Sequence, residues 1–169
     1  MAVFDKLDWA NIDVMAIVAR YGLLTVDDKR VASHRTWLSE AGYKIVELDC
    51  GLGFAHVLDE VNRLFRWDEN FGYELSVDRC SLDAVNDGFE FDFGGTSGIV
   101  LQLNEPDVLW ETEPKWILGL LSIVNVYSHT QLALGNRFFT LLVMPDSSPL
   151  IGQIIDSISV PSRQNARLG

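Results

Sequence analysis

The chain has 169 residues, of which 48% are hydrophobic, with five Trp and nine Phe. This length and composition favour one folded domain with a sizeable core and argue against wholesale disorder. The 24 acidic residues outnumber the 13 basic ones and give a net charge of −11. This charge argues against direct binding to nucleic acid, because phosphate contacts need Lys and Arg.

The sequence predicts neither a membrane span nor a signal peptide. A membrane helix needs about 18 or more apolar residues in a row, and the first residues lack a basic region followed by an apolar core. We therefore expect a cytoplasmic protein without a membrane partner. Cys50 and Cys80 lie far apart in the sequence, and two reduced cysteines are the expectation for such a chain.

The first predicted elements are a strand and a helix. The apolar run from Val14 to Leu24 predicts a short strand or a strand pair. Ser33 is expected to cap a helix that carries Trp37 on its apolar face, and Gly42 can end that helix with a left-handed residue. We expect residues 1–42 to form an N-terminal extension packed on the core.

The middle of the chain predicts a strand over residues 43–48 and an amphipathic helix between Phe54 and Phe65. Residues 67–79 indicate a loop, and Ser81 can cap a helix from Leu82 to about Phe91.

The second half of the chain predicts a strand over residues 99–103, a long helix that Pro114 begins and Gly135 ends, and a strand over residues 138–143. This alternation of strands and helices indicates an α/β fold, with a central three-stranded parallel sheet flanked by helices. We expect residues 145–169 to form a C-terminal extension with a mobile end.

The segment from Asp68 to Asp92 is strongly acidic. It holds one base, Arg79, and eight acids: Asp68, Glu69, Glu74, Asp78, Asp83, Asp87, Glu90 and Asp92. Asp83 and Asp87 lie one helical turn apart in the run Leu82-Asp83-Ala84-Val85-Asn86-Asp87. Like charges four residues apart repel by about 0.2–0.5 kcal/mol. A helix that keeps such a pair is expected to present it to a basic partner.

Two short motifs in this part of the chain are Asn70-Phe71-Gly72 and Leu82-Asp83-Ala84-Val85-Asn86-Asp87. They resemble the barstar family, the intracellular inhibitors of barnase-type ribonucleases. The family shows an aromatic-aromatic-Gly element and then a Leu-Asp-Ala-Leu-x-Asp motif that opens its recognition helix. The resemblance spans about residues 43–144 and implies a barstar-like domain there.

The resemblance implies roles for several residues. Asp83 and Asp87 correspond to the two inhibitory carboxylates, and Asp87 to the one that occupies the phosphate site of the nuclease. Phe71 and Gly72 correspond to the adjacent aromatic loop. Three features depart from the family pattern. Asn86 stands where the family has a tryptophan, and Thr130 stands where it has a glutamate. The spacer from Tyr73 to Ser81 is longer than the corresponding spacer of the family.

The sequence therefore predicts an inhibitor or immunity protein that is not an enzyme and that blocks a basic ribonuclease-type toxin. Its partner-binding residues are expected to be Asp83, Asp87, Asn86, Phe71, Gly72, Tyr73, Glu74 and Asp78. Trp67 is a further candidate for an exposed anchor. Replacement of Asp87 is expected to cost more affinity than replacement of Glu60.

Three other interpretations stay open. Asp83 and Asp87 could line an acidic, metal-dependent hydrolase site, form a plain solvated helix face, or belong to an interaction module that binds another basic surface. The histidines favour no metal site, because His34, His56 and His129 are scattered and are expected at the surface or at helix edges. We expect no cofactor and no bound metal.

Overall fold

The computed structural model describes residues 12–155 and 158–162. Its centre is a sheet of four parallel strands in the order β1-β4-β3-β2. The strands are β1 (Leu23–Val26), β2 (Tyr43–Asp49), β3 (Gly98–Asn104) and β4 (Phe138–Val143). Leu23 pairs with Thr140, Ile99 with Phe138, and Tyr43 with Gly98.

The prediction of a three-stranded sheet is wrong, because the N-terminal segment supplies a fourth strand. All four residues of β1 are buried. β1 lies at the edge of the sheet next to β4, where Thr140 donates its backbone N–H to the Gly22 carbonyl at 2.7 Å. Residues 12–42 thus extend the sheet as well as covering it.

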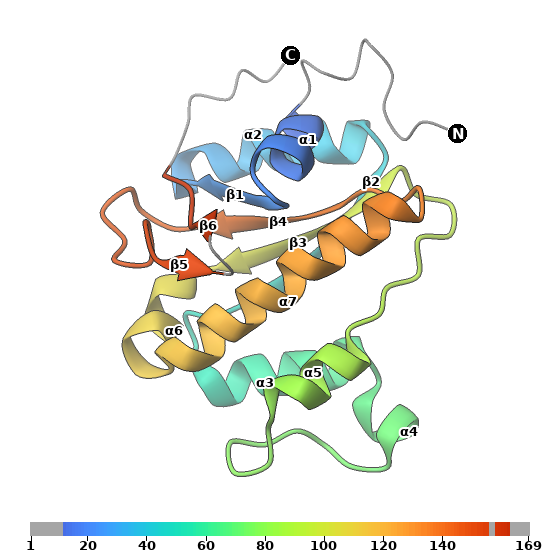
Figure 1. Cartoon of the computed structure of the whole chain (residues 1–169), viewed down its shortest axis with the longest axis vertical. Helices are drawn as coiled ribbons and strands as arrows, with labels where there is room; N and C mark the ends of the chain where they lie inside the picture. The colour runs from blue at the N-terminus through green and yellow to red at the C-terminus, as the bar shows by residue number, and fades with distance from the viewer. Residues whose placement is uncertain (1–11, 156–157, 163–169) are drawn as a thin grey trace.

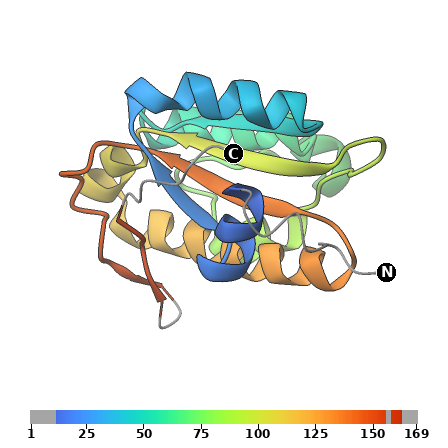
Figure 2. The same cartoon turned by 90° about the horizontal axis from the view of Figure 1, so that it is seen from above.

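Helices cover both faces of the sheet, and Figures 1 and 2 show α2 and α7 on opposite sides of it. The helical elements are α1 (Ile12–Val14), the π-helical turn η2 (Met15–Ala19), α2 (Asp28–Glu40), α3 (Phe54–Leu64), α4 (Trp67–Phe71), α5 (Leu82–Gly88), α6 (Pro106–Thr112) and α7 (Pro114–Ala133). The path from β2 through β3 to β4 crosses the sheet in one direction, whereas the step from β1 to β2 runs the other way. Crossovers of one hand then require α2 on the face opposite α3, α5 and α7.

Two apolar cores result, one on each face. The larger core lies beneath α3, α5 and α7 and includes Val57, Val85 and Leu121. The smaller core lies beneath η2 and α2 and includes Ile17 and Leu38. Strands buried on both faces explain the continuous apolar runs of β3 and β4.

Helix boundaries follow the expected signals in part. Gly42 and Gly135 have φ of +82° and +90° after α2 and α7, as predicted for left-handed stops, and Pro114 begins α7. α2 begins earlier than predicted, because the Asp27 side chain accepts the Arg30 N–H at 3.2 Å and caps the helix. Ser33 lies inside α2.

Two helices and one helix end differ from the sequence prediction. The segment predicted as a loop contains α4, and α6 lies between β3 and α7, where no helix was predicted. α5 ends at Gly88 rather than near Phe91, because the Phe91 N–H leaves the helical pattern and donates to the Tyr127 hydroxyl at 3.1 Å.

The segment after β4 packs on the molecule and ends in a small antiparallel pair, β5 (Ile154–Ile155) and β6 (Ile158–Ser159). Leu150 and Val160 are buried in the larger core, and the Thr25 hydroxyl of β1 donates to the Pro161 carbonyl at 2.8 Å. The end predicted to be mobile, residues 163–169, lies outside the described residues.

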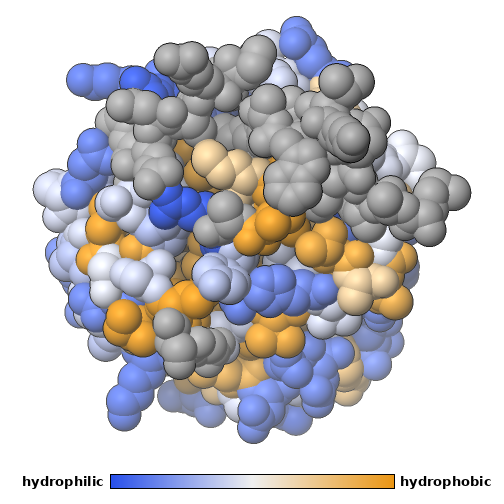
Figure 3. Space-filling view, turned by 45° about the horizontal axis from the view of Figure 1, so that its top comes forward, coloured by the Kyte–Doolittle hydropathy of each residue, from blue (hydrophilic) through white to orange (hydrophobic). Residues whose placement is uncertain are grey.

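The face seen in Figure 3 carries hydrophobic side chains across its middle, with hydrophilic ones along its lower rim.

Among the described helices, none is long and apolar enough to cross a membrane.

Candidate protein-interaction site

The short helix α5 is held on the core by its inner side. Ser81 caps it as predicted, since its hydroxyl accepts the Ala84 N–H at 3.1 Å. Val85 is 1% exposed, and Leu82 packs where Gly119 of α7 leaves room. A Cβ on Gly119 would lie 2.8 Å from Leu82 Cδ2. This close packing fixes which side of α5 faces outward.

The outer side of α5 presents Asp83, Asn86 and Asp87, and all three residues are exposed. Neither Asp83 nor Asp87 forms an ion pair with any other residue that the structure describes. Their charges therefore face solvent from a capped helix. This placement leaves both carboxylates available to a partner.

The short helix α4 brings an aromatic side chain to the end of α5. Phe71 is 42% exposed, and its ring centroid lies 4.6 Å from that of Trp67. Gly88 lies against both rings, because a Cβ there would be 3.1 Å from Phe71 Cε2. Phe71 and Asp87 line the same groove. Gly72 ends α4 with φ of +74°, which explains a glycine after the aromatic residue.

Trp67 is not an exposed anchor, because it is fully buried. Its indole supports Phe71 from below, and Tyr73 packs against it edge to face with centroids 6.5 Å apart. The sequence does not reveal this burial, since it depends on the close approach of Gly88 from another helix.

The lengthened spacer from Tyr73 to Ser81 is fastened at both ends. Leu75 is buried, and Asn62 of α3 clamps it by accepting the Leu75 N–H at 2.8 Å and donating to the Leu75 carbonyl at 2.9 Å. Trp116 Nε1 donates to Cys80 Sγ at 3.4 Å. The spacer is therefore an ordered part of the surface.

Within this spacer, Tyr73 is half-buried, and the Arg79 guanidinium lies 4.2 Å from the centroid of its ring. Tyr73 and Asp78 line a second, smaller hollow together with Ala84 of α5. Glu74 is exposed. The structure thus places Asp87 with Phe71 on one side of α5, and Asp78 with Tyr73 on the other.

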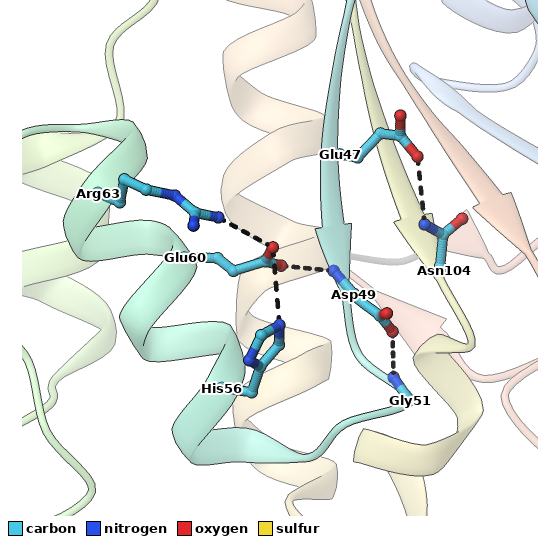
Figure 4. A network of polar contacts seen from close by, with 7 residues as sticks. All are labelled: Glu47, Asp49, Gly51, His56, Glu60, Arg63 and Asn104. Atoms are coloured by element: carbon cyan, nitrogen blue, oxygen red, sulfur yellow. Dashed lines mark hydrogen bonds and ion pairs between the residues drawn. The ribbon is translucent and has the colours of Figure 1, made fainter.

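Glu60, the residue compared with Asp87 in the affinity prediction, takes part in a network of polar contacts within the fold. Its carboxylate accepts the Asp49 backbone N–H and pairs with Arg63 at 3.2 Å and His56 at 3.7 Å (Figure 4). Asp49 in turn accepts the Gly51 N–H at 3.0 Å. This network ties α3 to the carboxyl end of β2, away from α5.

Two other titratable groups, His34 and Cys80, lie in packed surroundings. His34 is buried, which corrects its predicted surface position, and its Nδ1 lies 2.8 Å from the Arg30 carbonyl. Burial raises the pKa of the Cys80 thiol, and the Trp116 N–H lowers it in part. The described residues contain no group of three or more His, Cys, Asp or Glu side chains that could hold a metal ion.

The fold and this site define an α/β domain with a parallel four-stranded sheet and an acidic, solvent-facing helix. Comparison with known protein families, with characterised proteins and with solved structures found no match for this chain.

Proposed function

We propose that this protein is an inhibitor or immunity protein that blocks the active site of a basic ribonuclease-type toxin. The observation that carries the proposal is the outer side of α5, where Asp83 and Asp87 are both exposed on a helix whose inner side is packed. Asp87 takes the place of the RNA phosphate, and Asp83 binds beside it.

A carboxylate on a packed helix suits this role. It accepts bidentate hydrogen bonds from the Arg and Lys side chains that would otherwise grip a phosphate. A helix fixed by its cap and by Gly119 loses little freedom on binding, which favours affinity. The eight acids between Asp68 and Asp92 attract a cationic partner and raise its association rate.

The ordered spacer gives the site a means of choosing between related toxins. Glu74 and Asp78 are exposed on a segment that Asn62 and Trp116 hold in place. Fixed charges at the edge of an interface discriminate between partners by attraction or repulsion. Phe71 supplies an apolar anchor next to Asp87.

The test measures how strongly the protein inhibits a small basic ribonuclease of the barnase type. The rate at which the nuclease cleaves a fluorogenic RNA is the readout. Asp87→Asn should weaken inhibition at least tenfold, or about 1.4 kcal/mol, because it removes a charge from the contact. The matched control is Glu111→Gln on the exposed side of α6, which removes one negative charge from the chain just as Asp87→Asn does. Equal, small effects of both substitutions would contradict the proposal.

A further inference from the structure

A groove of about 770 Å³ lies beside Asp87, at the amino end of the sheet. Segments far apart in the sequence form its walls: the start of β2, the ends of α3 and α4, the end of α5 and the turn after it, and Asn136 before β4. No single motif in the sequence predicts this groove.

The floor of the groove is apolar and already formed. Phe65 and Phe91 are 7% and 9% exposed, and their ring centroids lie 5.2 Å apart. Tyr127 fixes the Phe91 backbone through the hydrogen bond described above. Phe71 stands on one wall with its ring against Trp67 and with 42% of its surface exposed. An occupant therefore meets aromatic carbon without a rearrangement of the core.

The rim of the groove is negative on balance. Asp87, Glu90 and Asp92 contribute three exposed carboxylates, although Asp92 also accepts the Gly94 N–H at 2.8 Å. The cations of the lining are Lys44 and Arg66. Arg66 forms an ion pair with Glu69, which lies outside the lining and raises the pKa of the guanidinium. The charge that faces an occupant thus favours a cation.

An exposed aromatic ring beside carboxylates suits one cation in particular. A guanidinium is planar, stacks on aromatic faces and donates a fork of hydrogen bonds to a carboxylate. A lysine ammonium is compact and strongly hydrated, so it gains less from the ring.

We propose that this groove binds an arginine side chain of the protein partner, with the guanidinium stacked on Phe71 and hydrogen-bonded to Asp87. The inference rests on the proposed function, because a basic protein partner supplies the arginine. It identifies the cation that Asp87 meets, and it makes Phe71 a residue that determines specificity for arginine over lysine.

The direct test is an NMR titration of the ¹⁵N-labelled chain with N-acetyl-arginine amide, and separately with N-acetyl-lysine amide, at equal ionic strength. The arginine probe should bind weakly and shift the amide signals of Phe71 and of residues 87–94, and the lysine probe should bind at least threefold more weakly. Equal binding of both probes, or shifts scattered over the acidic surface, would overturn the proposal. Uridine is titrated as a third probe, and binding to the groove as strong as that of the arginine probe would also overturn the proposal. Self-association through the groove, measured by ultracentrifugation, would overturn it as well.

Phe71→Leu keeps apolar bulk against Trp67 and removes the aromatic face. It should weaken arginine binding at least threefold and leave lysine binding unchanged, whereas Glu111→Gln should change neither. An arginine affinity unaffected by Phe71→Leu would refute the stacking contact.

The nuclease assay separates this inference from the proposed function. Inhibition that depends on Asp87 but survives Phe71→Leu, without arginine binding in the groove, would reject the groove and retain the inhibitor. Arginine binding without inhibition of any basic ribonuclease would reject the inhibitor and retain the groove.

Discussion

Gly88 is the residue at which α5 comes closest to the aromatic core. A Cβ at this position would lie 2.5 Å from Cη2 of the buried Trp67. Alanine is ordinarily the better helix former, by about 1 kcal/mol. Here the close packing should reverse the sign, so that Gly88→Ala destabilises the protein by about 1–3 kcal/mol in urea unfolding.

The matched control for Gly88 is Asn86→Ala, on the exposed side of the same helix. It should change stability by no more than about 0.5 kcal/mol. A Gly88→Ala protein as stable as the wild type would show that α5 can shift away from Trp67. That outcome would weaken the claim of a fixed outer side.

Cys50 makes stability depend on pH in the alkaline range. It is fully buried, and burial raises the pKa of its thiol to about 12, with further contributions from the carboxylates of Asp49 and Glu60. In the unfolded chain the thiol ionises above about pH 8.5. The folded state therefore keeps a proton that the unfolded state loses, and stability falls as pH rises.

The expected fall due to Cys50 approaches about 1.4 kcal/mol per pH unit above pH 9. Urea unfolding of Cys50→Ala at pH 8, 9 and 10 should show a shallower decline than the wild type. Cys80 is unchanged in both proteins, so the difference in slope isolates Cys50. Parallel slopes would mean that the thiol ionises in the folded state as well.

At the scale of elements, the first part of the spacer from Tyr73 to Ser81 is held by one side chain of α3, Asn62. Asn62→Ala removes both hydrogen bonds to Leu75 and should cost about 1–3 kcal/mol, because the Leu75 backbone groups lose their partner. Hydrogen exchange should accelerate in residues 73–80 and stay unchanged in α7. Asn86→Ala is again the control.

The strongly periodic elements were predictable from the sequence. α3 begins at Phe54 and α7 at Pro114, as the apolar spacing and the proline indicate. The sequence did not predict that β1 belongs to the sheet, because its partner β4 lies near the other end of the chain. α6 was missed although Pro106 lies in its first turn, because its N-cap, Glu105, has φ of +51° and makes no side-chain cap.

The site was predictable only where it is local. Ser81 and the acids of α5 lie within one short stretch, so the cap and the exposed pair could be inferred from spacing. The burial of Trp67 and the groove depend on residues from separate elements, such as Gly88, Lys44 and Asn136. Those contacts are tertiary, and no local pattern encodes them.

At the scale of the whole molecule, Asp13 ties the N-terminal segment to the sheet. Its carboxylate is 2% exposed, accepts a hydrogen bond from the Tyr43 hydroxyl at the start of β2, and pairs with Arg137 before β4 at 3.1 Å. Burial and this carboxylate raise the pKa of Tyr43 well above its usual range. One side chain thus joins α1 to two strands.

Asp13→Ala should destabilise the protein by about 3–5 kcal/mol, because it leaves the buried part of this network without its anion. Calorimetry or urea unfolding measures the loss. Asp28→Ala, on the exposed first turn of α2, should cost less than about 1 kcal/mol. Similar losses in the two variants would mean that the pairing of β1 with β4 and the apolar contacts hold residues 12–42 without help from Asp13.

The division of α5 into a packed side and a solvent-exposed side has an evolutionary consequence. Leu82, Val85 and Gly88 pack against the rest of the molecule, whereas the side chains of Asp83, Asn86 and Asp87 are exposed. Mutations at the latter three positions can accumulate one at a time without unfolding the domain. Under the proposed function, substitutions at these three exposed positions can change partner choice while Leu82, Val85 and Gly88 keep the helix in place.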